Sequence, residues 1–198
     1  MTGPYEWNPM PHQTSVTCIE CDGLASFEFA EVLRIEKKED VPYFQDSPLF
    51  DYQFVQGGIH GNWHAAFYFH GLHRRSLEAV SDLPARYSPH DWDHSQYLYR
   101  SHGLDLGTLS CRKCGLVLKH KLSWPTDAYY QADIRGETLW AFNRESLIAL
   151  RNYVAATDRK KLRNGPWSGF LLKVPTNFLR RNVRSKALKQ IDRLLATT

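Results

Sequence analysis

Two CxxC motifs, Cys18-Ile-Glu-Cys21 and Cys111-Arg-Lys-Cys114, contain all four cysteines of this 198-residue chain. A two-residue spacer lets both sulfurs of a motif bind one ion, because a tight turn brings them to the same side. Two such motifs complete the tetrahedral sulfur shell that Zn²⁺ prefers. The sequence therefore predicts one structural zinc ion per chain, bound by Cys18, Cys21, Cys111 and Cys114. The alternatives are two disulfides or four unrelated buried thiols.

The wide separation of the two motifs constrains the fold further. A four-cysteine shell leaves no coordination position for water or substrate, so it is structural and names no reaction. The 89 residues between Cys21 and Cys111 far exceed the gap in a simple zinc ribbon. We therefore expect residues 24–105, approximately, to form a β-rich insertion between the two knuckles.

Alternating apolar residues predict strands within this insertion and after the second knuckle. Phe27, Phe29, Leu33 and Ile35 alternate within 24–36, which predicts a strand, with a helix over 28–38 as the alternative. Aromatic β-formers occupy 67–69. Further strands are expected at 50–55, 64–69, 116–122, 129–134 and 139–142. A short helix is expected over 89–101, with Ser88 as its N-cap.

The C-terminal third predicts helices. Asn143 is a suitable N-cap for a helix whose apolar residues Leu147, Leu150 and Val154 share one face. A second helix is expected to run to about Leu195. The predicted fold class is α+β: an antiparallel zinc-ribbon sheet, the insertion, and two C-terminal helices. The expected domains are a flexible arm at 1–13, a zinc-ribbon β domain at 14–143, and a basic helical tail at 144–198 packed on it.

The net charge of +4 conceals a strong asymmetry. Residues 144–198 contain 13 Lys and Arg against 3 Asp and Glu, a net charge of +10, so residues 1–143 carry −6. A basic segment beside an acidic body favours a polyanionic partner, with nucleic acid first, although a solvated basic helix face is the common alternative. The predicted nucleic-acid-binding residues are Arg159, Lys160, Lys161, Arg163, Arg180, Arg181, Arg184, Lys186 and Lys189.

Residues 137–195 resemble the C-terminal part of a group of uncharacterised bacterial zinc-ribbon proteins. The resemblance is carried by LWAFNRESL (139–147), RNYVAA (151–156) and FLLKVPTNFLRR (170–181), together with the second CxxC knuckle. It implies a zinc ribbon, a strand-to-helix corner at LWA(F/Y)NRE, and basic C-terminal helices. The group has no assigned activity, so the resemblance transfers no catalytic residue, and the long insertion departs from its compact members.

Histidines suggest a second candidate site. His60, His64 and His70 are close in sequence, and His90, Asp91 and His94 follow. Histidine with carboxylate is ligand material for a catalytic metal, so the alternative function is a metal-dependent hydrolase or nuclease that uses these six residues. On a strand, His64 and His70 would share a face. The structural alternative is that these histidines are polar residues at the ends of a sheet, either hydrogen-bonded or exposed to solvent.

We interpret the chain as a zinc-stabilised binding protein rather than an enzyme, with nucleic acid as the expected partner. A protein-interaction scaffold, in which the acidic body docks a basic partner, is a third possibility. No apolar run is long enough to span a membrane, and residues 1–13 do not form a signal peptide. Paired thiols without an export signal favour the cytoplasm.

Overall fold

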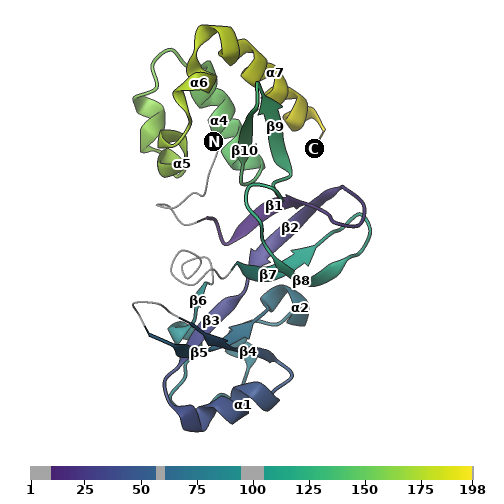
Figure 1. The fold of residues 1–198 in the computed structure, drawn as a ribbon, viewed down its shortest axis with the longest axis vertical. Helices are drawn as coiled ribbons and strands as arrows, with labels where there is room; N and C mark the ends of the chain where they lie inside the picture. Colours follow the sequence, from purple (N-terminus) through teal and green to yellow (C-terminus); the bar gives the residue numbers. More distant parts are fainter. Residues whose placement is uncertain (1–9, 57–60, 95–104, 198) are drawn as a thin grey trace. The chain divides into compact units, whose positions relative to one another are not determined.

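The computed structural model describes residues 10–56, 61–94 and 105–197 (Figure 1). The chain divides into two compact units. The first combines the described part of Met1–Thr17 with Trp124–Thr198, and the second is Cys18–Ser123. This division differs from the predicted boundary at 143/144, because the strands just before Asn143 share a hydrophobic core with the C-terminal helices.

The ribbon sheet of the second unit carries both knuckles. Strands β2 (Leu24–Phe29), β7 (Leu106–Ser110) and β8 (Val117–Lys121) are antiparallel, in the order β2-β7-β8. The first knuckle leads into β2, and the second connects β7 to β8. The sheet therefore brings two sequence-distant CxxC motifs to the same end, as a zinc ribbon requires.

The insertion forms a second antiparallel sheet, as the sequence predicts. Its order is β4-β5-β3-β6, from β4 (Phe50–Val55), β5 (Trp63–Tyr68), β3 (Glu31–Ile35) and β6 (Asp93–His94). The single strand expected over 24–36 is in fact two strands. The chain leaves β2 at Ala30, whose N–H donates to the Leu106 carbonyl (2.9 Å), and enters the insertion sheet as β3.

Both faces of the insertion sheet bury apolar side chains. Phe44 of α1 (Val41–Asp46) packs on one face with Phe50 and Tyr87. Trp63, Phe67 and Phe69 lie in a separate cluster with Ala65 and Val32. Because successive side chains of a strand point to opposite faces, β5 contributes to both clusters and reads as a nearly continuous buried run.

The helix expected over 89–101 is wrong in its described part. Ser88 does cap a turn that starts with Pro89, but the turn is a 3₁₀ helix that ends at Asp91. The chain then extends into β6, where Asp93 pairs with Val32 and His94 with Glu31. Pairing with β3 therefore outweighs the local preference of these residues for a helix. Residues 95–101 of the predicted helix lie outside the described residues.

The first unit packs helices against a hairpin. Strands β9 (Tyr130–Ile134) and β10 (Glu137–Ala141) are antiparallel. Val16 of β1 (Gln13–Thr17) forms an isolated bridge with Ala128, two residues before β9. The two predicted C-terminal helices are α4 (Arg144–Ala155) and α7 (Arg181–Ala196). Two short helices, α5 (Ser168–Leu172) and α6 (Thr176–Leu179), lie between α4 and α7 in the sequence. A further short helix, α2 (His70–His73), belongs to the second unit.

The predicted corner between β10 and α4 is confirmed. The Asn143 side chain accepts a hydrogen bond from the Ser146 amide (2.9 Å), and the Ser146 hydroxyl accepts one from the Asn143 amide (3.0 Å). This capping box satisfies backbone donors at the start of α4. Trp140 and Phe142, which come just before it, are buried in the core with Phe170. Nowhere in the described chain does a helix have the length and apolar character needed to cross a membrane.

Candidate functional site

The four cysteines converge into one sulfur cluster. All four Sγ atoms lie within 4.8 Å of one another, with Cys18 Sγ–Cys114 Sγ at 3.6 Å and Cys21 Sγ–Cys111 Sγ at 3.7 Å. A tetrahedron of sulfurs around zinc with Zn–S bonds of about 2.3 Å has edges of about 3.8 Å. A disulfide requires about 2.0 Å, so these cysteines are free thiols arranged to hold one metal ion, and the spacing fits zinc.

The two knuckles have the same backbone geometry. The Cys18 amide donates to the Gly23 carbonyl, and the Cys111 amide donates to the Leu116 carbonyl, both at 2.8 Å and both to the fifth residue along. Each knuckle therefore presents its pair of sulfurs in the same way. Two similar half-sites, each on one loop, build the four-coordinate shell.

The pKa values of the thiols differ within the cluster, and the mutual repulsion of the thiolates explains why it favours a cation. A hydrogen bond from the Cys114 backbone, stronger in effect than the opposing desolvation, lowers the pKa of Cys111 to about 6. A backbone hydrogen bond at Leu116 favours the Cys114 thiolate, but desolvation and the other three sulfurs outweigh it and raise the pKa of Cys114 to about 12. Four thiolates repel one another at this distance, and a divalent cation at the centre removes that repulsion.

Gly23 makes room beside the cluster. A Cβ atom at Gly23 would lie 3.0 Å from the Lys113 side chain and 3.2 Å from Cys21 Sγ. The Lys113 stem therefore passes close to the first knuckle, which places a cationic side chain near sulfurs that become anionic when they bind metal. Cys18 and Cys111 are buried, Cys21 is half-buried, and Cys114 is exposed.

The structure does not bring the predicted histidine site together. The His64 ring stacks on Tyr52 and shares a hydrogen bond with its hydroxyl (2.6 Å), whereas His70 lies in α2, 3.3 Å from Glu28 Oε1. Because β5 ends at Tyr68, the expectation that His64 and His70 share a strand face is wrong.

The remaining residues of that set have separate structural places. His90 lies in the 3₁₀ turn, Asp91 accepts a hydrogen bond from the Ser88 amide (2.8 Å), and His94 lies in β6. His60 lies outside the described residues. Within the described ranges, the four cysteines form the only group of three or more His, Cys, Asp or Glu side chains placed to share a metal ion.

Three of the predicted nucleic-acid-binding arginines line one hollow of the first unit. The hollow has a volume of about 630 Å³. Its lining residues are Thr157, Arg159, Leu179, Arg181, Arg184, Ser185 and Leu188. In the described part of the chain, no carboxylate contributes to this lining, and neither Arg181 nor Arg184 forms a salt bridge. The hollow is therefore a concave, cationic surface.

The helix α7 divides the predicted basic residues between two faces. Arg181, Arg184 and Leu188 recur at spacings of three and four, so they share the face that lines the hollow. Lys186 lies five residues after Arg181, about 140° further round the helix, with Lys189 also outside the lining. The predicted basic set is thus not one continuous patch on this helix.

The other members of the predicted set add less. Arg180 is exposed and lines a different pocket of the first unit. Lys160 is exposed beside Asp158, whose carboxylate accepts a hydrogen bond from the Lys160 backbone amide (3.0 Å). The side chains of Lys161 and Arg163 are not described. The polar and apolar parts of the hollow were not predicted, although Ser185 and Leu188 lie four residues after Arg181 and Arg184 and therefore on the same face of the helix.

Comparisons with protein-family models, with curated proteins and with solved structures found no match to this chain. The four-cysteine cluster agrees with the zinc ribbon that the resemblance implies. Membership of the bacterial zinc-ribbon group otherwise stays a prediction, and the site must be interpreted from its own chemistry.

Proposed function

We propose that this protein is a zinc-stabilised, cytoplasmic nucleic-acid-binding protein of the bacterial zinc-ribbon group, and that its binding surface is the arginine-lined hollow of the first unit. The observation that carries the proposal is the meeting of Arg159, Arg181 and Arg184 around one concavity. Guanidinium groups bind phosphate oxygens through paired N–H donors, and they do so without reading bases. The hollow therefore suits a nucleic-acid backbone.

Charge supports a polyanionic partner for this unit in particular. Residues 1–17 and 124–198 contain 14 Lys and Arg against 7 Asp and Glu, a net charge of +7, whereas residues 18–123 carry −3. A local excess of this size attracts a polyanion at long range and makes its binding salt-dependent.

The conformation of Arg159 favours a preformed site. Its Nε donates to the Tyr153 carbonyl (2.9 Å), and its guanidinium carbon lies 5.8 Å from the centre of the Tyr153 ring. These contacts fix the side chain at the C-terminal end of α4 while leaving donors on its terminal nitrogens. A fixed guanidinium loses less conformational entropy when it binds a phosphate.

The zinc centre has a structural role in this proposal. A closed four-sulfur shell offers no site for catalysis and stabilises the second unit. We assign no reaction to the chain.

Fluorescence anisotropy with labelled 20-nucleotide DNA and RNA, single-stranded and duplex, tests the proposal. The double variant Arg181→Ala/Arg184→Ala should weaken binding by about tenfold or more at moderate salt. It should also reduce the log–log salt slope on duplex DNA by about 1.8, because two phosphate contacts are lost.

The matched control removes the same charge from residues of α7 that do not line the hollow, as Lys186→Ala/Lys189→Ala. This variant should retain most of the affinity. Equal losses in the two variants would show that net charge alone drives binding and would contradict the hollow as the site. The absence of binding at low salt would reject nucleic acid as the partner.

A further inference from the structure

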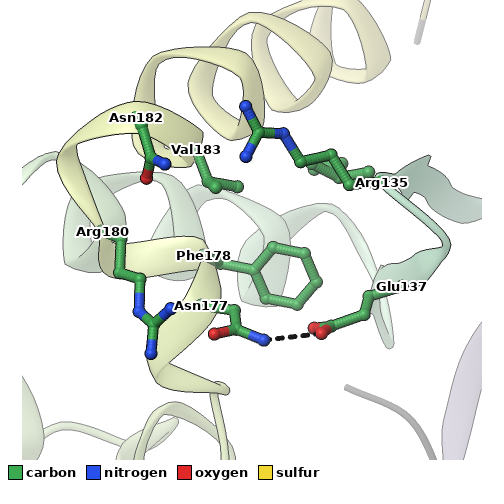
Figure 2. A pocket seen from close by; sticks show the side chains of 8 residues that line it. Arg135, Glu137, Asn177, Phe178, Arg180, Asn182 and Val183 are labelled. Atoms are coloured by element: carbon green, nitrogen blue, oxygen red, sulfur yellow. Dashed lines mark hydrogen bonds between the residues drawn. The ribbon is translucent and has the colours of Figure 1, made fainter.

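A second pocket of the first unit lies between the β9–β10 turn and the start of α7 (Figure 2). It has a volume of about 240 Å³. Its lining residues are Ile134, Arg135, Glu137, Asn177, Phe178, Arg180, Asn182 and Val183. The buried Phe178 lines this cavity together with Arg135, on the turn, and Arg180, at the junction of α6 and α7; all three are labelled in Figure 2. Two guanidiniums from sequence-distant segments therefore contribute to one small cavity.

The backbone of Arg135 is unusual for its residue type. Arg135 has φ of 60° and Gly136 has φ of 79°, so this two-residue hairpin turn has the left-handed residues of a type I′ turn. Asn, Asp and Gly are the residues that normally occupy the first position, and an arginine there costs backbone energy. Strained residues cluster at ligand sites, so Arg135 is a candidate contact for a ligand of this pocket.

The start of α7 carries positive side chains, where helix N-termini usually carry negative ones. Helix N-termini carry a partial positive charge and normally attract Asp or Glu. The first turn of α7 contains no acidic residue, and its N-cap, Arg180, makes no side-chain capping bond. Arg180, Arg181 and Arg184 lie there instead. This 16-residue helix therefore begins in mutually repelling positive charge, which a bound anion would relieve.

Among the described residues that line the pocket, Glu137 is the only carboxylate. Its Oε1 accepts a hydrogen bond from Asn177 Nδ2 (2.6 Å; Figure 2). The two guanidiniums still leave the lining with a net charge of +1, before the helix terminus is counted. Glu137 and Asn177 together offer acceptors and a donor to hydroxyl or amino groups, so the pocket suits an anion that carries a polar organic part.

From the cavity, the two arginines and the reversed charge at α7, we propose that this pocket binds a phosphate monoester. A monoester carries close to two negative charges and three acceptor oxygens, which matches two guanidiniums that line one small cavity. The volume admits a phosphate with a small organic part, and lies below the range usual for drug-sized ligands. The phosphate belongs to a free small molecule or to the terminus of a nucleic acid. The proposal does not rest on nucleic-acid binding at the other hollow.

The test is calorimetric titration of the full-length, zinc-loaded protein with AMP and with adenosine. AMP should bind and adenosine should not, because the phosphate supplies the contacts. Arg135→Asn removes the guanidinium and places a favoured residue in the turn, so affinity for AMP should fall at least about tenfold while the melting temperature stays equal or rises. Arg180→Ala should weaken AMP similarly, and Arg193→Ala, an exposed arginine at the other end of α7, should not.

Equal binding of AMP and adenosine, or unchanged AMP affinity in Arg135→Asn, would overturn the proposal. Competition with oligonucleotides identifies the source of the phosphate. Displacement of AMP by a 5′-phosphorylated strand, but not by its 5′-hydroxyl counterpart, supports a nucleic-acid terminus, and displacement by neither strand supports a free small molecule. Equal displacement by both strands would show recognition of internal phosphodiesters and would also overturn the proposal. None of these AMP measurements depends on the Arg181→Ala/Arg184→Ala result.

Discussion

Asp22 and Gly115 occupy equivalent positions in the two zinc knuckles. Each follows the second cysteine of its motif, each has a positive φ (55° and 78°), and each amide donates to the carbonyl of the first cysteine at 3.0 Å. Left-handed backbone at this position closes the turn that orients both sulfurs. Glycine adopts it freely, and aspartate tolerates it better than most residues.

This relationship predicts that Gly115→Ala destabilises the zinc-loaded protein by roughly 1–2 kcal/mol. A Cβ at Gly115 would meet no atom within 4 Å, so the loss comes from backbone strain alone. Urea unfolding measures it. Gly165→Ala is the matched control, because a Cβ there also meets nothing but the backbone has φ of −94°. That variant should be neutral or slightly stabilised, and an equal loss in both would contradict the geometric account.

Removal of the metal should unfold the ribbon sheet selectively. Binding of structural zinc contributes about 10–16 kcal/mol of apparent free energy in small zinc domains, which is comparable with the whole stability of a domain. After chelation, backbone amides of β2 and β7 should exchange rapidly with deuterium. Amides of α4 and α7, which belong to the other unit, should stay protected. Uniform loss of protection would mean that the two units do not fold separately.

Asp105 predicts a pH-dependent loss of stability. Burial, only partly opposed by Lys121, raises the pKa of this carboxyl from its ordinary value to about 7. The folded state therefore favours the protonated form, and the stability associated with it is present below about pH 4 and is lost as the pH rises towards 7.

The variant Asp105→Asn should consequently be more stable than the wild type at neutral pH. The advantage should grow by about 1 kcal/mol between pH 6 and pH 8 and then level off. Denaturant unfolding of both proteins in the zinc-loaded state measures this difference, in which the pH dependence of zinc binding cancels. A constant difference between pH 6 and pH 8 would show that the carboxyl titrates at its ordinary pKa.

The capping box at α4 predicts a cost of about 1 kcal/mol for Asn143→Ala. The substitution removes the acceptor of the Ser146 amide, which is 2.9 Å from Asn143 Oδ1, and leaves that donor without its partner. Asn143→Asp should retain the bond and most of the stability, since Asp is an equally good N-cap. Thermal unfolding of the two variants compares them; equal melting temperatures would argue against the cap.

The sequence predicted the cysteine cluster and the β10–α4 corner because both depend on local signals. CxxC spacing determines how two sulfurs can be presented, and an asparagine before an apolar helical repeat determines where a helix begins. Ala30 illustrates what local signals miss: the alternation of apolar residues continues from Phe27 to Ile35, yet the chain changes sheets at this point. Which partner strand each half finds depends on contacts distant in sequence.

The same limit explains the candidate surfaces. Arg159 and Arg181 are far apart in sequence, and only the packing of α4 and α7 on one core places them around one hollow. In the sequence, Arg135 is a single charged residue between two predicted strands, and nothing there predicts a binding role for it. Its left-handed backbone and its place in the same pocket as Arg180 become apparent only in three dimensions.

Zinc K-edge X-ray absorption of the purified protein, combined with metal quantification, identifies the atoms that bind the metal. We expect one zinc per chain with four sulfur ligands at about 2.3 Å, and loss of that zinc in Cys111→Ser. A coordination shell containing nitrogen or oxygen from the protein, or zinc retained in full by Cys111→Ser, would contradict the four-cysteine centre.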